Sequence, residues 1–293
     1  MSYVERALTF ACCDERLVGV LAEPEAAGDL GVVIVVGGPQ YRVGSHRQFL
    51  LLGRRLAAEG IAVLRFDYRG MGDATGSARS FEDVSPDIAA AIDTFQAACP
   101  TLRRIVLWGL CDAAAAALIY CESTRDTRVA GVALLNPWVR SDATMAKAQL
   151  KHYYGRRLFE REFWAKLARG GVDLREAARS MARSIGTASM GRSGAKGAGA
   201  ASFQDRMTKG LEAFAGPVLI LLSERDLTAK EFVEFARSEP RWRALLARRN
   251  VERHDVADAD HTFSTARARS EVEDRTLSWV RQTLLANARC GAC

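Results

Sequence analysis

The stretch WGLCDAAAAAL, residues 108–118, decides how this sequence is organised. It joins an apolar run, RIVLWG at 104–109, to an alanine-rich helical run. Cys111 lies two residues after Gly109 and two before Ala113, which matches the small-x-nucleophile-x-small pattern of a tight strand-to-helix turn. The free amides and the dipole at the start of the helix favour a thiolate at this position. We therefore predict that Cys111 is a nucleophile at the end of a buried strand.

Strand-like and helix-like segments alternate on both sides of this turn. An antiparallel hairpin is expected first, and it is followed by continuous β-branched and apolar runs that are typical of strands buried on both faces. The expected strands are 6–13, 16–24, 31–36, 61–67, 104–109, 129–138, 216–226 and 250–256. The expected helices are 45–60, 85–99, 112–123, 228–238, a further one from 240, and 266–288. This alternation predicts a mostly parallel sheet with helical crossovers on both faces.

Local signals indicate where some of these elements begin and end. For the helix at 45–60, Ser45 is the expected N-cap and Gly60 the C-terminal stop. In the loop that starts at FDYRGMGD, Asp67 is expected to tie down its own loop, with Arg69 as its partner.

The alternation breaks after Trp138. Residues 140 to 185 are helical and charged, and 186–202 are small residues that cannot bury a core. We therefore predict a core formed by 1–139 and 211–293, and a helical cap or lid at 140–210 in which 186–202 is flexible.

Two residues far along the chain complete a catalytic set with Cys111. His261, in the loop ADADHTF, follows the last expected strand, and Asp226 ends the strand LILLSERD. The order nucleophile, acid, histidine is the one that a nucleophile-elbow fold uses. Asp258 and Asp260 are rival partners for His261, although they lie on the histidine's own loop.

The oxyanion of a tetrahedral intermediate needs two amide donors. The N–H of Asp112, directly after the nucleophile, is the first. The second is expected in the loop VVGGPQYRVG, where Gly38 is favoured and Gln40 is held in reserve because Pro39 has no N–H. His46 either contacts substrate or is a solvated helix start. The candidate substrate-binding residues are Gln40, Tyr41 and His46.

Composition excludes several other classes of function. The chain has 293 residues, a formal net charge of +6 and seven cysteines, an odd number without the spacing of a disulfide framework. Glu5 and Arg6 interrupt what would be the apolar core of a signal peptide, and no apolar run is long enough to span a membrane. We expect a cytoplasmic protein. The scattered arginines indicate a solvated basic face more than a nucleic-acid surface, and the sequence does not indicate the oligomeric state.

Metal and cofactor chemistry is not expected either. The four histidines lack the HxH or HExxH spacing of metal ligands, and the glycine-rich stretches lack the Gly-Lys-Ser/Thr ending of a phosphate loop. We expect no metal and no cofactor, and the expected ligand is a small-molecule or carrier-bound acyl substrate.

Taken together, VIVVGGPQ, FDYRGMGDATG, GLCDA, LLSERD and DADHTF resemble the α/β-hydrolase superfamily over nearly the whole chain. Within it, GGPQYRVGSHRQF and WGLCDAA resemble the exosortase A system-associated hydrolase 1 group, hydrolases encoded beside exopolysaccharide and protein-sorting genes. The resemblance implies an eight-stranded, mostly parallel sheet with a helical cap. Val36-Gly37 replaces the usual His-Gly before the oxyanion loop, and a cysteine replaces the usual serine nucleophile, as in enzymes similar to dienelactone hydrolase.

These observations predict a hydrolase that cleaves an ester or thioester through Cys111, His261 and Asp226 and an acyl-enzyme intermediate. Two alternatives remain open. An acyltransferase would use the same acyl-cysteine, and a non-catalytic scaffold with the hydrolase fold would leave Cys111 unreactive.

Overall fold

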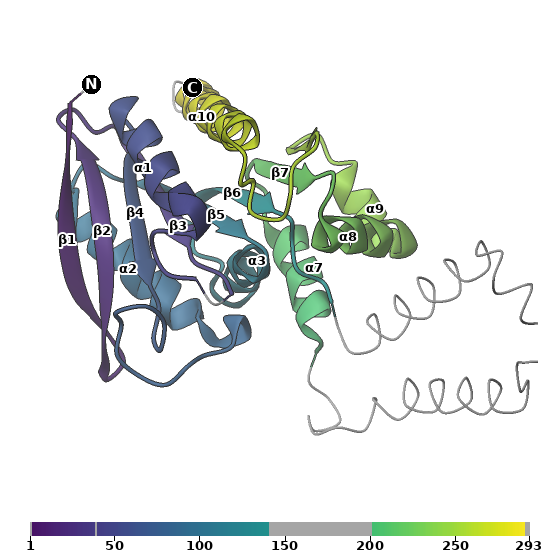
Figure 1. The fold of residues 1–293 in the computed structure, drawn as a ribbon, viewed down its shortest axis with the longest axis horizontal. Coiled ribbons are helices and arrows are strands. Elements are labelled where there is room, and N and C mark those ends of the chain that lie inside the picture. Colours follow the sequence, from purple (N-terminus) through teal and green to yellow (C-terminus); the bar gives the residue numbers. More distant parts are fainter. Residues whose placement is uncertain (1, 39, 141–200, 291–293) are drawn as a thin grey trace, which may run out of the picture. The chain divides into compact units, whose positions relative to one another are not determined.

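The computed structural model describes residues 2–38, 40–140 and 201–290, with side chains to residue 283. Within this part the strands form one eight-stranded sheet in the order β1-β2-β4-β3-β5-β6-β7-β8 (Figure 1). β2 pairs antiparallel with β1 and with β4, and the remaining pairs are parallel. The strands are β1 (Tyr3–Cys12), β2 (Glu15–Pro24), β3 (Leu30–Val35), β4 (Ala62–Asp67), β5 (Arg104–Leu110), β6 (Val129–Leu135), β7 (Val218–Ser223) and β8 (Val251–Val256). The predicted mostly parallel, eight-stranded sheet is confirmed.

Helices cover both faces of the sheet, as the continuous apolar strands require. In β3, Val32 and Ile34 join the apolar cluster under α1 and α10, whereas Val33 and Val35 join the cluster on the opposite face. The described helices are α1 (Gln48–Ala58), α2 (Ser85–Ala98), α3 (Asp112–Thr124), α7 (Phe203–Ala213), α8 (Leu227–Ser238), α9 (Pro240–Leu246) and α10 (Ala266–Cys290), with short 3-10 turns at Ser45–Arg47 and Phe81–Asp83.

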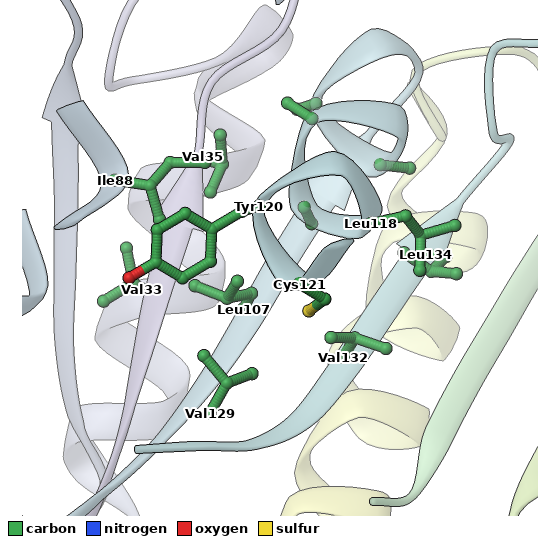
Figure 2. Close-up of a cluster of buried hydrophobic side chains, with 14 of the residues drawn as sticks. Val33, Val35, Ile88, Leu107, Leu118, Tyr120, Cys121, Val129, Val132 and Leu134 are labelled. Atoms are coloured by element: carbon green, nitrogen blue, oxygen red, sulfur yellow. The ribbon is translucent and has the colours of Figure 1, made fainter. Parts of the chain in front are cut away.

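Helix α3, which follows the predicted nucleophile directly, is buried over most of its length. Its residues from Ala113 to Cys121 are all buried. Figure 2 shows Tyr120 and Cys121 of this helix among Leu107 and Val132 of the neighbouring strands. The five consecutive alanines have small side chains that allow the helix to approach the sheet closely. The start of α3, directly after Cys111, is therefore held firmly against the ends of the central strands.

The start of the first helix differs from the sequence prediction. Ser45 does not cap a regular helix, because the chain first forms a 3-10 turn in which His46 and Arg47 adopt left-handed conformations (φ 53° and 62°). Helix α1 begins only at Gln48, without a side-chain cap. The backbone N–H of Ser45 instead donates to Oε1 of Gln40, 3.0 Å away. The predicted stop is confirmed, because Gly60 follows α1 with φ 86°.

The predicted cap at 140–210 lies largely outside the described residues, and so does most of the segment 186–202. Its boundary at 210 requires correction, because α7 runs through this position and residues from Ser202 onward group with the first unit, Met1–Val139. A Cβ atom on Gly210 would lie 2.0 Å from the carbonyl oxygen of Leu118 in α3. The chain therefore rejoins the core about ten residues earlier than expected, through a close helix–helix contact.

Two carboxylates organise the loop after β4. Asp67 ties down its own loop as predicted, because its Oδ2 accepts the Asp73 N–H at 3.1 Å, but its arginine partner differs from the prediction. Asp67 pairs with Arg42 rather than with Arg69, and its Oδ1 accepts the Arg42 backbone N–H at 2.6 Å. Arg69 is paired with Asp87 of α2 through Nε and Nη2, at 2.9 and 2.7 Å. Arg69 is 6% exposed and Asp87 is fully buried.

The Asp87→Asn variant should be strongly destabilised. Removing one partner of a buried ion pair leaves the other charge uncompensated, at a cost of about 3–5 kcal/mol. Urea unfolding followed by circular dichroism measures the loss. As a control, Asp255→Asn breaks an exposed pair with Arg253 and should cost less than about 1 kcal/mol. Equal losses in the two variants would contradict a stabilising role for the buried pair.

Candidate active site

Cys111 occupies a sharp turn between β5 and α3. Its backbone angles, φ 63° and ψ −123°, lie in a region that L-residues rarely adopt. Three backbone hydrogen bonds hold it there: the Cys111 N–H donates to Leu135 of β6 at 2.8 Å, and its carbonyl accepts from Ala114 and Trp138, both at 3.1 Å.

Glycine is required two residues before the cysteine. A Cβ atom on Gly109 would lie 2.6 Å from the carbonyl carbon and oxygen of Ala113. The turn is therefore as tight as the sequence pattern predicts, and it leaves the Cys111 side chain half-buried at the strand ends.

The predicted acid and histidine meet at the same edge of the sheet. Asp226 follows β7 and His261 follows β8, and Nδ1 of His261 donates to Oδ2 of Asp226 at 2.8 Å. Asp226 is 7% exposed and also caps α8, because its carboxylate accepts the backbone N–H groups of Thr228 and Ala229. These bonds fix the carboxylate, and the carboxylate in turn orients the imidazole ring.

The ring also reaches the cysteine. The hydrogen bond to Asp226, followed by the interaction with Cys111, raises the pKa of His261 to about 10, although burial opposes this rise. Burial raises the pKa of Asp226, but the hydrogen bond and charge of His261 outweigh it, so the pKa lies below its usual value. The structure thus brings together the three predicted side chains as a sulfur–imidazole–carboxylate series.

The rival acids have other partners. Asp258 forms an exposed ion pair with Arg225, and Asp260 accepts hydrogen bonds from the backbone N–H and the hydroxyl group of Ser264. Asp226 is the carboxylate to which the imidazole is hydrogen-bonded.

The loop after β3 lies against the start of α3. The Gly38 N–H, which the sequence predicts as an oxyanion donor, donates to Oδ2 of Asp112 at 2.9 Å. The Asp112 N–H is the first of helix α3, and the first N–H groups of a helix have no partner within it. Of the two predicted oxyanion donors, the Asp112 N–H therefore lies at the start of α3, and the Gly38 N–H is hydrogen-bonded to the Asp112 carboxylate.

The predicted substrate-binding residues flank this loop. Gln40 is half-buried and uses its side-chain oxygen to accept the Ser45 N–H, while Tyr41 is 47% exposed. His46 is exposed in the turn before α1.

One residue of the site has no signal in the sequence. Asn136 is fully buried directly after β6, with φ 42°. Its side-chain amide donates to the Ser223 hydroxyl at 2.8 Å and to the His261 carbonyl at 3.0 Å, and its oxygen accepts the Ser223 N–H at 2.8 Å. Asn136 thereby ties the loop that carries the imidazole to the end of β7.

Among the described residues, no group of three or more histidine, cysteine, aspartate or glutamate side chains could hold a metal ion. In the same part of the chain, none of the helices is both long and apolar enough to cross a membrane.

A sheet of this topology, with a cysteine at the turn after β5, an acid after β7 and a histidine after β8, defines an α/β-hydrolase. The sequence matches the serine aminopeptidase S33 family over residues 30–238. This is more than half of the chain, and the protein belongs to that family. No curated protein matches the sequence.

Several solved structures share the fold. An esterase of Pyrococcus furiosus is 18% identical with a TM-score of 0.63, over 96% of this chain and 91% of the esterase. An α/β-hydrolase from a Penicillium species is 17% identical with a TM-score of 0.63, over 96% and 99% of the two chains. A dienelactone hydrolase from Anabaena variabilis is 14% identical with a TM-score of 0.61, over 96% and 98%. At these identities the similarity shows the fold.

The Asp226→Asn variant should lower the pKa of His261 from about 10 toward the ordinary value of 6.5, because the bond to the carboxylate is the largest influence on it. NMR titration of the imidazole measures this value, with the His254 resonance as an internal control. Because the pKa of His261 is higher in the folded than in the unfolded state, protonation of the imidazole stabilises the fold. This contribution is fully present below about pH 6.5 and is lost as the pH rises through 10. The variant should lose that pH dependence, and an unchanged His261 titration would contradict the pairing.

Proposed function

We propose that the protein hydrolyses an ester or thioester, with Cys111 as nucleophile, His261 as general base and acid, and Asp226 as the group that orients the imidazole. The observation that carries the proposal is the convergence of Cys111, His261 and Asp226 at the ends of β5, β8 and β7, where His261 is hydrogen-bonded to Asp226 and its pKa responds to Cys111. The solved relatives include proteins named as esterases, which is consistent with this reaction class.

The chemistry proceeds in two halves. The raised pKa of His261 means that the imidazole holds a proton beside the sulfur, so that Cys111 attacks the acyl carbon as a thiolate. A carbon–sulfur bond forms, and the leaving group departs with the proton of His261. Water then gives a proton to His261 and attacks the thioester, the carbon–sulfur bond breaks, and the acid is released. The Asp112 N–H supports the oxyanion in both halves.

A thiol nucleophile narrows the substrate class. A thiolate leaves a tetrahedral intermediate more readily than an amine does, so attack on a peptide bond tends to revert. Thioesters and activated esters carry leaving groups that compete with the thiolate. We therefore propose an oxygen or sulfur leaving group, although the family name refers to aminopeptidases with a serine nucleophile.

The cellular setting is also a proposal. The five cysteines whose side chains the structure describes are free, which supports a reducing compartment and a cytoplasmic location. The resemblance of GGPQYRVGSHRQF and WGLCDAA to the exosortase-associated hydrolases supports an acyl substrate, free or carrier-bound, linked to exopolysaccharide systems.

A panel of short-chain p-nitrophenyl esters and acyl-coenzyme A thioesters tests the activity. We expect the wild-type protein to hydrolyse members of both groups and Cys111→Ala to be inactive. Cys111→Ser should fold but lose most activity, on the order of 10²-fold or more, because the imidazole is tuned to a more acidic partner than a hydroxyl. Full activity of Cys111→Ser, or an inert wild-type protein, would contradict the proposal.

Alkylation by iodoacetamide at neutral pH tests the nucleophile without a substrate. Cys13 is also exposed and lies 3.4 Å from the Arg69 guanidinium, so modified residues must be mapped by peptide mass spectrometry. Labelling of Cys111 should be fast and should slow at least about tenfold in His261→Ala, whereas Cys13 should be labelled equally in both proteins. The absence of labelling at Cys111 in folded wild-type protein would contradict the proposal.

A further inference from the structure

The amide that an oxyanion would need from the loop after β3 is already engaged. The Gly38 N–H donates to Oδ2 of Asp112 at 2.9 Å, and Asp112 directly follows Cys111. The other carboxyl oxygen, Oδ1, is buried without a hydrogen-bond partner. A carboxylate oxygen on this amide is an acceptor of the same charge as the oxyanion of a tetrahedral intermediate.

The packing around Gly37 holds the carboxyl group in this place. A Cβ atom on Gly37 would lie 2.2 Å from Oδ1 of Asp112 and 2.7 Å from the carbonyl oxygen of Leu110. Any side chain at this position would therefore push the carboxyl group away from the loop. Gly38 has φ 59°, a conformation that favours glycine, and a Cβ atom there would meet nothing within 4 Å. The glycine pair leaves room both for the carboxyl group and for movement of the Gly38 amide.

The groups around Asp112 shift its pKa in opposite directions. Burial raises the pKa of Asp112, and the amides of Gly38, Ala113 and Asp112 itself oppose this rise together with the charge of His261, but the pKa remains above its usual value. Asp112 also acts on Tyr68, which follows β4. Burial raises the pKa of Tyr68, and the charge of Asp112 raises it further. Cys111 precedes Asp112 on the turn.

We propose that the Asp112 side chain is an internal ligand of the oxyanion hole: it holds the Gly38 amide in the resting enzyme and competes with the acyl oxygen for it. This inference rests on the proposed function. A hydrogen bond to a carboxylate is roughly twice as strong as one between neutral groups, so the neutral carbonyl of a bound substrate does not displace Asp112. The oxyanion carries a full charge and can displace the Asp112 carboxylate. Breaking the internal hydrogen bond then offsets part of the stabilisation that the Gly38 amide gives the transition state.

Two variants weaken the internal ligand in different ways. Asp112→Asn keeps the shape and replaces the carboxylate by a weaker, neutral acceptor, and Asp112→Ala removes the acceptor. Both should raise kcat/KM for p-nitrophenyl acetate about tenfold, mainly through kcat, because the recovered donor acts in the transition state. Asp258→Asn is the matched control: it removes one carboxylate charge from the histidine loop, without a contact to Gly38, and should change neither parameter.

A ligand that forms an oxyanion tests the competition at equilibrium. 1,1,1-Trifluoroacetone adds to a reactive thiolate to give a hemithioketal, whose oxygen takes the place of the carbonyl oxygen of a substrate. Fluorine NMR measures its dissociation constant, which should be about tenfold lower in both Asp112 variants than in the wild type at neutral pH. This advantage should shrink toward acidic pH, because protonation of Asp112 in the wild type weakens the competitor.

The outcomes separate the two proposals. If the wild type forms the adduct but both Asp112 variants, folded by circular dichroism, bind it equally or more weakly, Asp112 supports the loop and the internal-ligand proposal is overturned while the nucleophile stands. If no protein forms the adduct, or Cys111→Ala forms it as well as the wild type, the assignment of Cys111 fails and both proposals fall. Tighter binding in both Asp112 variants, with Asp258→Asn unchanged, supports the inference.

Discussion

Cys111 has backbone angles that an L-residue keeps only when its surroundings hold it there, at a cost of about 1–3 kcal/mol. The backbone bonds to Leu135 and Trp138 hold the turn from the β6 side, and the missing side chain of Gly109 lets α3 begin at once. The buried length of α3 then fixes the direction of the helix. Because the turn is held in this way, the sulfur stands at the strand ends, beside the first amides of the helix.

The position of the turn could be predicted from the sequence because its pattern is local and the surrounding runs are strongly apolar. The positions of Asp226 and His261 followed from topology: the carboxyl ends of parallel strands meet at one edge of a sheet, so residues far apart in the chain come together there. The same argument favours Asp226 over Asp258, because an acid that follows another strand approaches the imidazole ring from outside the histidine's own loop.

The contacts that support the site could not be predicted, because they depend on tertiary packing without a local signal. Asp67 and Arg69 are close in sequence, yet each finds its partner elsewhere, in Arg42 and Asp87. Asn136 follows a strand and has no distinguishing pattern in the sequence, yet its side-chain amide donates a hydrogen bond to the carbonyl of His261. The hydrogen bond from the Gly38 N–H to the Asp112 carboxylate joins positions 74 residues apart. Because of this bond, one of the two predicted oxyanion donors already has an acceptor.

The central claim is that an acyl group passes through the sulfur of Cys111. Rapid acid quenching of the wild-type protein during turnover of p-nitrophenyl acetate, followed by intact-mass and peptide mass spectrometry, tests this most directly. The account predicts one acetyl group per protein, on the peptide that contains Cys111. Turnover with the acetyl group on another residue, or with no acetylated protein at any time after mixing, would contradict it.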